Sequence, residues 1–150
     1  MRVTVLNGPN LNLLGTREPE RYGRTSLDEI ERLVGEHAAG LGVALRWYQT
    51  NHEGAFVDLV HQLPGEADGA LVNAAAFTHT SLAIRDALLA VRVPFVEVHL
   101  SNVLAREERR RTSLLADLAI GIVAGFGPRS YVLGLDALLA ELKTRGAGSS

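Results

Sequence analysis

Glu97 and His99 have the residue types and the spacing of a proton donor and its partner. They alternate with hydrophobic residues in the run Phe95 to His99, so a strand would place both on one face, with Cα atoms about 7 Å apart. A buried carboxylate is costly unless it is paired, and pairing with an imidazole fixes the tautomer and helps the ring to hold a proton that it can donate. The alternative is a purely structural pair, but the end of a strand favours function.

A second candidate group lies in the segment from Asn7 to Arg24, which is rich in proline, glycine and arginine. We expect a mobile loop, and long loops inside a compact domain often act as lids over a site. An arginine beside the phenol of Tyr22 would lower the tyrosine pKa from its usual value of about 10 and make it a usable base. Arg17 is the favoured arginine, with Arg21 and Arg24 as competitors. The alternative is a disordered surface loop with an ordinary exposed tyrosine.

His79 lies among hydroxyl residues, just before a segment with helical spacing. The free N–H groups at a helix start suit an anion or a carbonyl oxygen, so His79 is a candidate ligand-binding residue. The alternative is a capping or core histidine.

The run from Arg106 to Arg111 contains four arginines and two glutamates. Its interleaved acids are typical of a solvated helix with i,i+4 ion pairs. If the run is helical, Arg106 and Arg110 share a face, and either could make a two-pronged contact with a substrate carboxylate.

Five short apolar runs must position these residues, and helical segments separate most of them. The alternation predicts an α/β fold, a three-layer αβα sandwich of the flavodoxin-like kind, with a five-stranded parallel sheet of order 2-1-3-4-5. The strands are expected at 3–6, 43–48, 70–72, 95–100 and 120–124, and the helices at 27–41, 55–63, 82–91 and 131–143. Ser26 and Glu29 fit a capping box, Gly42 ends the first helix, and Pro64 stops the second. Residues 1–150 form one catalytic domain in this interpretation, with a frayed tail from about residue 144.

Polar groups follow three of the predicted strands. Ligands of open parallel sheets bind outside the carboxyl ends of the strands, so we expect these groups to converge in space. They are Asn7 to Asn10, Asn73, and His99 to Asn102.

Composition narrows the chemistry. A net charge of −2 leaves no global positive field to recruit nucleic acid, so we expect no nucleic-acid partner, and the absence of cysteine excludes thiolate chemistry. Lys143 is the sole lysine, which argues against Schiff-base catalysis. The apolar start is too short for a signal peptide and no run could span a bilayer, so we expect a cytoplasmic protein with no membrane partner.

Cofactor motifs are weak or missing. No histidine pair has a recognised metal-ligand spacing, which leaves metal-dependent hydrolysis as a minor alternative. There is no P-loop, and Gly125-Phe126-Gly127 gives only part of a dinucleotide fingerprint. We therefore expect no cofactor.

Taken together, the motifs strongly resemble those of the type II 3-dehydroquinate dehydratases, nearly from end to end. The matching motifs are Asn7-Gly8-Pro9-Asn10-Leu11-Asn12-Leu13-Leu14-Gly15, Arg17-Glu18-Pro19, Tyr22-Gly23, Asn51-His52-Glu53-Gly54, Thr78-His79-Thr80-Ser81, Arg85-Asp86-Ala87, Glu97-Val98-His99-Leu100-Ser101-Asn102, Ala105-Arg106-Glu107, Gly125-Phe126-Gly127 and Ser130-Tyr131.

The resemblance implies cofactor-free removal of water from 3-dehydroquinate to give 3-dehydroshikimate, in the shikimate pathway. It makes Tyr22 the base that takes a proton beside the ketone, with Arg17 stabilising the phenolate and the transition state. It makes His99, held by Glu97, the acid that protonates the departing hydroxyl. Asn10 is expected to orient a water near the developing enolate.

The resemblance also implies the substrate contacts and the assembly. Asn73, His79 and Arg110 would contact the substrate, and the backbone at Leu100 and Ser101 would help to hold its carboxylate. Asp86 would reach the substrate of a neighbouring subunit, which implies trimers, commonly four in a homododecamer.

The chain departs from the family pattern at two places. It carries alanines at 74–76 where relatives often have proline or glycine, and Arg109 at a place that is often aromatic. The second departure leaves Arg106 as a competitor of Arg110. The runner-up function is a non-catalytic module of the same fold that binds a small carboxylate.

Overall fold

The computed structural model describes residues 1–16, 20 and 24–148, and its centre is a five-stranded parallel sheet. The strand order is β2-β1-β3-β4-β5, as predicted. The strands are β1 Arg2–Asn7, β2 Ala44–Gln49, β3 Gly69–Asn73, β4 Phe95–His99 and β5 Gly121–Ala124. All residues of β3 and β4 are buried, as continuous apolar strands covered on both faces should be.

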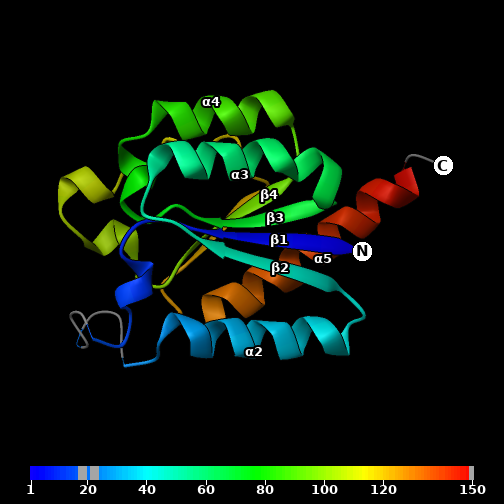
Figure 1. The fold of residues 1–150 in the computed structure, drawn as a ribbon, viewed down its shortest axis with the longest axis horizontal. Helices are drawn as coiled ribbons and strands as arrows, with labels where there is room; N and C mark the ends of the chain where they lie inside the picture. Colours follow the sequence, from blue (N-terminus) through cyan, green and yellow to red (C-terminus); the bar gives the residue numbers. More distant parts are fainter. Residues whose placement is uncertain (17–19, 21–23, 149–150) are drawn as a thin grey trace.

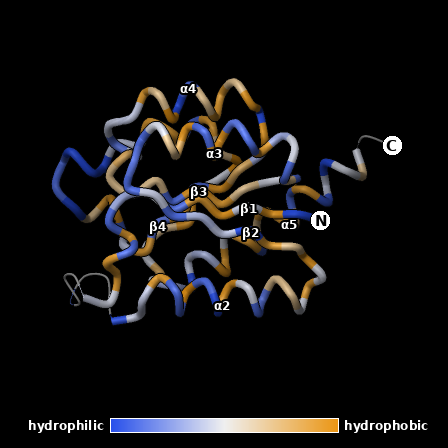
Figure 2. The backbone as a smooth tube through the Cα atoms, viewed as in Figure 1, coloured by the Kyte–Doolittle hydropathy of each residue, from blue (hydrophilic) through white to orange (hydrophobic). Residues whose placement is uncertain are grey.

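Helices cover both faces of the sheet (Figure 1). One layer contains α2 (Leu27–Gly40) and α5 (Arg129–Gly148), and the other contains α3 (Glu53–Glu66) and α4 (Leu82–Val91). Each layer has its own buried apolar cluster against the sheet. Figure 2 shows the result: β1 and β3 are largely hydrophobic, while α2 alternates between hydrophobic and hydrophilic residues.

The first predicted helix forms as its capping pattern indicates. The hydroxyl of Ser26 accepts a hydrogen bond from the Glu29 backbone N–H at 3.2 Å. The helix ends at Gly40, and Gly42 has a positive φ of 71°, which glycine adopts without strain. The buried positions Ile30, Val34 and Ala38 follow the helical period that predicted the element.

Two helices, α3 and α5, run further than predicted. The helix α3 passes Pro64 and continues to Glu66, because a proline near the end of a helix removes one hydrogen bond and leaves the last turn in place. The predicted frayed tail is helical as far as Gly148. An ion pair between Glu141 and Arg145 at 3.7 Å supports that last part of α5.

The segment after β1 is more ordered at its start than the expected loop. Residues Leu11–Leu13 form a short 3-10 helix, η1, and Leu11 and Leu14 are buried in the core. Among the described residues, no helix is both long enough and apolar enough to cross a membrane.

Candidate active site

A pocket opens at the carboxyl end of the sheet, where the segments after β1, β3 and β4 come together (Figure 1). It encloses about 700 Å³ when its open mouth is included. The predicted convergence of the polar strand ends is confirmed, because Asn10, Asn73 and His99 all line it.

Glu97 and His99 form a buried pair, of which His99 lines the pocket. Their relative exposures are 1% and 5%, and Glu97 Oε2 lies 2.8 Å from His99 Nε2. The predicted meeting of the two side chains on one strand face is therefore confirmed. Since Glu97 occupies Nε2, the ring nitrogen left for a ligand is Nδ1.

A third residue, Ser113, holds the other carboxylate oxygen. Its hydroxyl donates to Glu97 Oε1 at 2.6 Å. Motif analysis missed this residue because it belongs to none of the recognised motifs and is 16 positions away from Glu97. The only indication in the sequence was indirect: a buried carboxylate that pairs with His99 through one oxygen needs a second hydrogen-bond donor for the other oxygen.

Asn73, at the end of β3, is held by a buried network. Its amide N–H donates to the Tyr131 hydroxyl at 2.8 Å, and that hydroxyl donates to Asn7 Oδ1 at 2.6 Å. Burial raises the pKa of the Tyr131 phenol well above its usual value, so Tyr131 is a neutral hydrogen-bonding group. Sequence reasoning noted Tyr131 only within a motif and gave it no role.

The backbone beside Asn73 is strained. Ala75 has a positive φ of 51°, a left-handed conformation that costs an L-residue roughly 1–2 kcal/mol. Asn73 Oδ1 accepts the Ala75 N–H at 3.2 Å and so helps to hold this turn. Both residues line the pocket, so the strain lies at the site itself.

Replacing Ala75 by glycine should stabilise the protein by about 1 kcal/mol, since glycine adopts positive φ without steric cost. Thermal unfolding followed by circular dichroism should show Tm raised by roughly 3 °C. Ala76 is the matched control because it has no positive φ, and Ala76→Gly should lower Tm. An equal lowering of Tm in Ala75→Gly and Ala76→Gly would show that the Ala75 backbone is not strained.

Asn10 has a left-handed backbone with φ of 69°, which asparagine tolerates better than most residues. Its backbone N–H donates to Asn51 Oδ1 at 2.9 Å. Gln49, at the end of β2, also binds Asn51 Oδ1, at 3.0 Å. The edge strand thereby fixes the turn that places Asn10 at the pocket.

His79 ends a 3-10 helix, η2 (Ala75–His79), and lines the pocket. Its Nδ1 lies 2.8 Å from the Thr112 carbonyl oxygen and must donate, because a carbonyl only accepts. Nε2 is therefore the nitrogen left for a ligand. The capping alternative is not what is observed, since Ser81 caps α4 with a bond to the Ile84 N–H at 2.9 Å.

The arginine-rich run does not form the solvated helix that its charge spacing suggested. Two 3-10 helices replace it, η3 (Val103–Ala105) and η4 (Glu108–Arg110), with an extended Arg106 between them. Short 3-10 turns suit a segment without an apolar stripe to bury.

The two candidate arginines nevertheless both line the pocket. The Arg106 side chain is 10% exposed and that of Arg110 is 31% exposed. Arg110 Nε donates to Glu107 Oε1 at 2.6 Å. Hydrogen bonds from its own backbone amide and from Arg110 hold the Glu107 pKa below its usual value. Arg109 is exposed and does not line the pocket.

The remaining predicted residues fall into three groups. Leu100 and Ser101 line the pocket directly after β4. Asp86 is exposed on α4 and is not part of the pocket. Arg17 and Tyr22 lie outside the described residues.

Most of the chain matches one known protein family. The family described as "Dehydroquinase class II" matches residues 1–139. The chain belongs to the class II dehydroquinase family. The family assignment made from the motifs is therefore confirmed over nearly the whole chain.

Individual relatives agree with the family assignment. The 3-dehydroquinate dehydratase of Carboxydothermus hydrogenoformans is 56% identical over 145 residues, which cover 97% of this chain and 94% of that protein. The 3-dehydroquinate dehydratase of Dinoroseobacter shibae is 51% identical over 142 residues, with 95% of each chain covered.

Solved structures of the dehydroquinase family share the fold. The type II dehydroquinase of Butyrivibrio crossotus has a TM-score of 0.90 at 38% identity, covering 92% of this chain and 97% of that one. That of Propionibacterium acnes has a TM-score of 0.87 at 39% identity, covering 91% and 94%.

Proposed function

We propose that this chain is a 3-dehydroquinate dehydratase that removes water from 3-dehydroquinate to give 3-dehydroshikimate, a step of the shikimate pathway. The observation that carries the proposal is the buried Glu97–His99 pair beneath a pocket lined by arginines, in a member of the class II dehydroquinase family.

His99 is the proposed acid. The leaving hydroxyl needs a proton as its bond to carbon breaks, and His99 supplies it from the nitrogen that does not face Glu97. Glu97 is catalytic through this contact, because its negative charge stabilises the protonated ring. The low exposure of the pair strengthens that interaction.

Tyr22 is the proposed base. It takes the proton from the carbon beside the ketone, which leaves an enolate that expels the hydroxyl as water. Arg17 stabilises the phenolate and the transition state. This assignment rests on the family motif, since both residues lie outside the described part of the chain.

The proposed substrate contacts come from the other pocket residues. Asn73, His79 and Arg110 bind the substrate, and the backbone at Leu100 and Ser101 holds its carboxylate, with Arg106 as the alternative arginine. Asn10 orients a water near the enolate. Preset donors of this kind often supply the largest part of catalysis.

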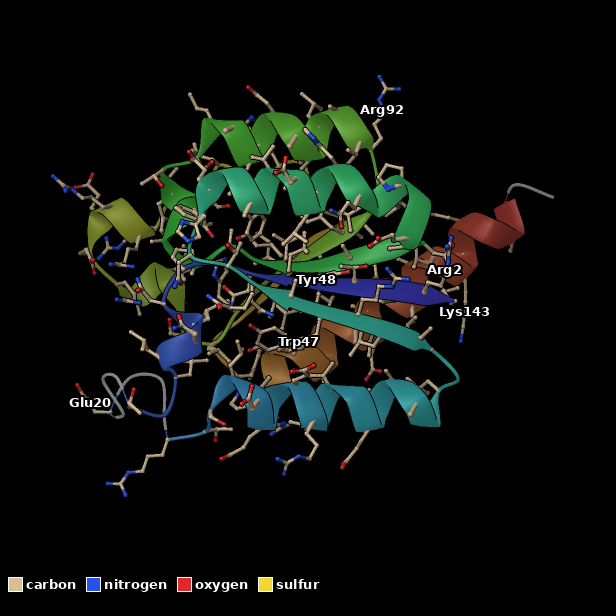
Figure 3. The ribbon with its side chains drawn as sticks, viewed as in Figure 1. Arg2, Glu20, Trp47, Tyr48, Arg92 and Lys143 are labelled. Atoms are coloured by element: carbon tan, nitrogen blue, oxygen red, sulfur yellow. The ribbon has the colours of Figure 1, made fainter. Side chains whose placement is uncertain are left out.

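The reaction needs no cofactor in this proposal. The one residue that could form a Schiff base, Lys143, lies on α5 at the other end of the molecule from the pocket (Figure 3). We also propose a cytoplasmic location.

Trimers that assemble into a homododecamer are the proposed quaternary structure. Asp86 is exposed on α4, together with Leu82 and Leu89 on the same helix. An aspartate outside its own pocket and beside exposed leucines suits a subunit contact. Light scattering of the purified chain measures the assembly.

The decisive experiment is incubation of the purified chain with 3-dehydroquinate, followed by the ultraviolet absorbance of the conjugated enone. We expect turnover that survives treatment with a chelator. No product, with or without added metal, would overturn the proposal. Tight binding in calorimetry without product would instead identify a non-catalytic module.

A further inference from the structure

Ser113 has a hydroxyl whose hydrogen bonds are completely determined. Its Oγ accepts the N–H groups of Leu115 and Ala116, each at 3.0 Å. Its single proton is then left for Glu97 Oε1 at 2.6 Å. The serine therefore donates to the carboxylate, and Oε1 acts purely as an acceptor.

The direction of the hydrogen bond from Ser113 limits where the proton between Glu97 and His99 can lie. Since Oε1 accepts from Ser113, a proton shared with the ring must lie between Oε2 and Nε2, which are 2.8 Å apart. A hydrogen bond to the charged form of an acid favours that form. The donated bond thus favours a carboxylate at Glu97 and leaves the proton on the ring.

Ser113 is itself held in place from two sides. The backbone N–H of Leu114 donates to the Thr78 carbonyl at 2.9 Å, and the Leu114 carbonyl accepts from Arg85 at 2.7 Å. Both contacts come from the β3–α4 part of the chain. The hydroxyl is thus presented by a fixed backbone.

We propose that Ser113 is a positioning residue of the proton donor: its hydroxyl keeps Glu97 as a carboxylate with one oxygen directed at His99, which keeps His99 protonated for the elimination. This inference rests on the proposed function of the site. Ser113 does not line the pocket, so we expect it to act through Glu97 and not on the substrate directly.

Other charged groups lie near the Glu97–His99 pair, and any test of Ser113 must leave the contacts of these groups unchanged. His79, Arg106 and Arg110 line the same pocket as His99. From α4, Arg85 is engaged by Asp117, with one contact at 3.0 Å. None of these side chains bonds to Ser113, so a substitution there leaves their contacts in place.

The test is the pH dependence of Ser113→Ala. Without the donated bond the Glu97 carboxylate is more basic, so it takes a larger share of the proton between Oε2 and Nε2, and the pair releases that proton at higher pH. We expect the alkaline fall of kcat to move upward by about one pH unit and kcat at neutral pH to fall roughly tenfold, because less of the proton lies on the ring. KM should change little, and Ser113→Thr should restore the wild-type profile, because it keeps the hydroxyl.

Ser130→Ala is the matched control for a lost serine hydroxyl. Ser130 is buried and accepts the Phe126 N–H at 3.0 Å, without contact to Glu97. Its removal should lower Tm without moving the pH profile. A double-mutant cycle adds a second control, since the Ser113→Ala effect should largely vanish in a Glu97→Gln background.

A proton NMR titration of the His99 ring provides a readout that is independent of turnover. The midpoint should rise by about one pH unit in Ser113→Ala and stay unchanged in Ser130→Ala. An unchanged midpoint, or equal Ser113→Ala effects in the wild-type and Glu97→Gln backgrounds, would overturn the role of Ser113. A shifted midpoint in a chain that does not turn over 3-dehydroquinate would refute the proposed function and leave the Ser113 contact intact.

Discussion

His99→Asn should lower kcat for 3-dehydroquinate about 1,000-fold, with a much smaller change in KM. Asparagine is close to histidine in size and can keep a hydrogen bond to Glu97, but it has no proton to give to the leaving hydroxyl. The buried position of the pair makes replacement by water inefficient, because His99 is only 5% exposed. Steady-state kinetics by enone absorbance measures both constants.

The same variant separates the two proton transfers. If another group removes the proton beside the ketone, His99→Asn should still exchange that proton, and substrate recovered from heavy water should carry deuterium. His37→Asn is the control, since His37 pairs with Asp136 at 2.6 Å on the surface between α2 and α5. A wild-type kcat in His99→Asn would remove His99 from the acid role.

The fold was predictable because its elements are signalled locally. Strands buried on both faces appear as continuous apolar runs, and the capping pair Ser26 and Glu29 marks the start of α2. The helix ends were less predictable. Whether a chain continues past Pro64 depends on what the last turn packs against, which local sequence does not encode.

The site was predictable where residues act within one strand or at strand ends. The two-residue period brought Glu97 and His99 together, and parallel topology brought Asn10, Asn73 and His99 to one edge. The supporting contacts depend on tertiary structure. Ser113 is 16 residues from Glu97, so no period connects them.

Tyr131 is a second supporting residue that local sequence patterns do not predict, at a larger sequence separation. It reaches Asn73 from 58 residues away, on a different element. The helix suggested for the arginine-rich run is absent for another reason. The same spacing of charges is compatible with an α-helix and with 3-10 turns, so the charges alone do not distinguish the two. Both candidate arginines still reached the pocket, because the segment follows directly after β4.

Tyr22→Phe should reduce kcat by roughly 1,000-fold or more while substrate binding in calorimetry stays nearly unchanged. Phenylalanine keeps the ring and loses only the oxygen that would accept the proton. Unlike His99→Asn, this variant should also lose deuterium exchange beside the ketone, because the proposed base acts in that first step. The pair of variants therefore assigns each residue to one proton transfer.

The chain offers a matched control for Tyr22→Phe, since it contains just three tyrosines. Tyr131 is unsuitable because it holds Asn73, whereas Tyr48 lies on β2 and does not line the pocket (Figure 3). Tyr48→Phe should keep both turnover and exchange. If Tyr22→Phe retains deuterium exchange at the wild-type rate, another group is the base, and the motif assignment of Tyr22 and Arg17 fails even if the chain dehydrates 3-dehydroquinate.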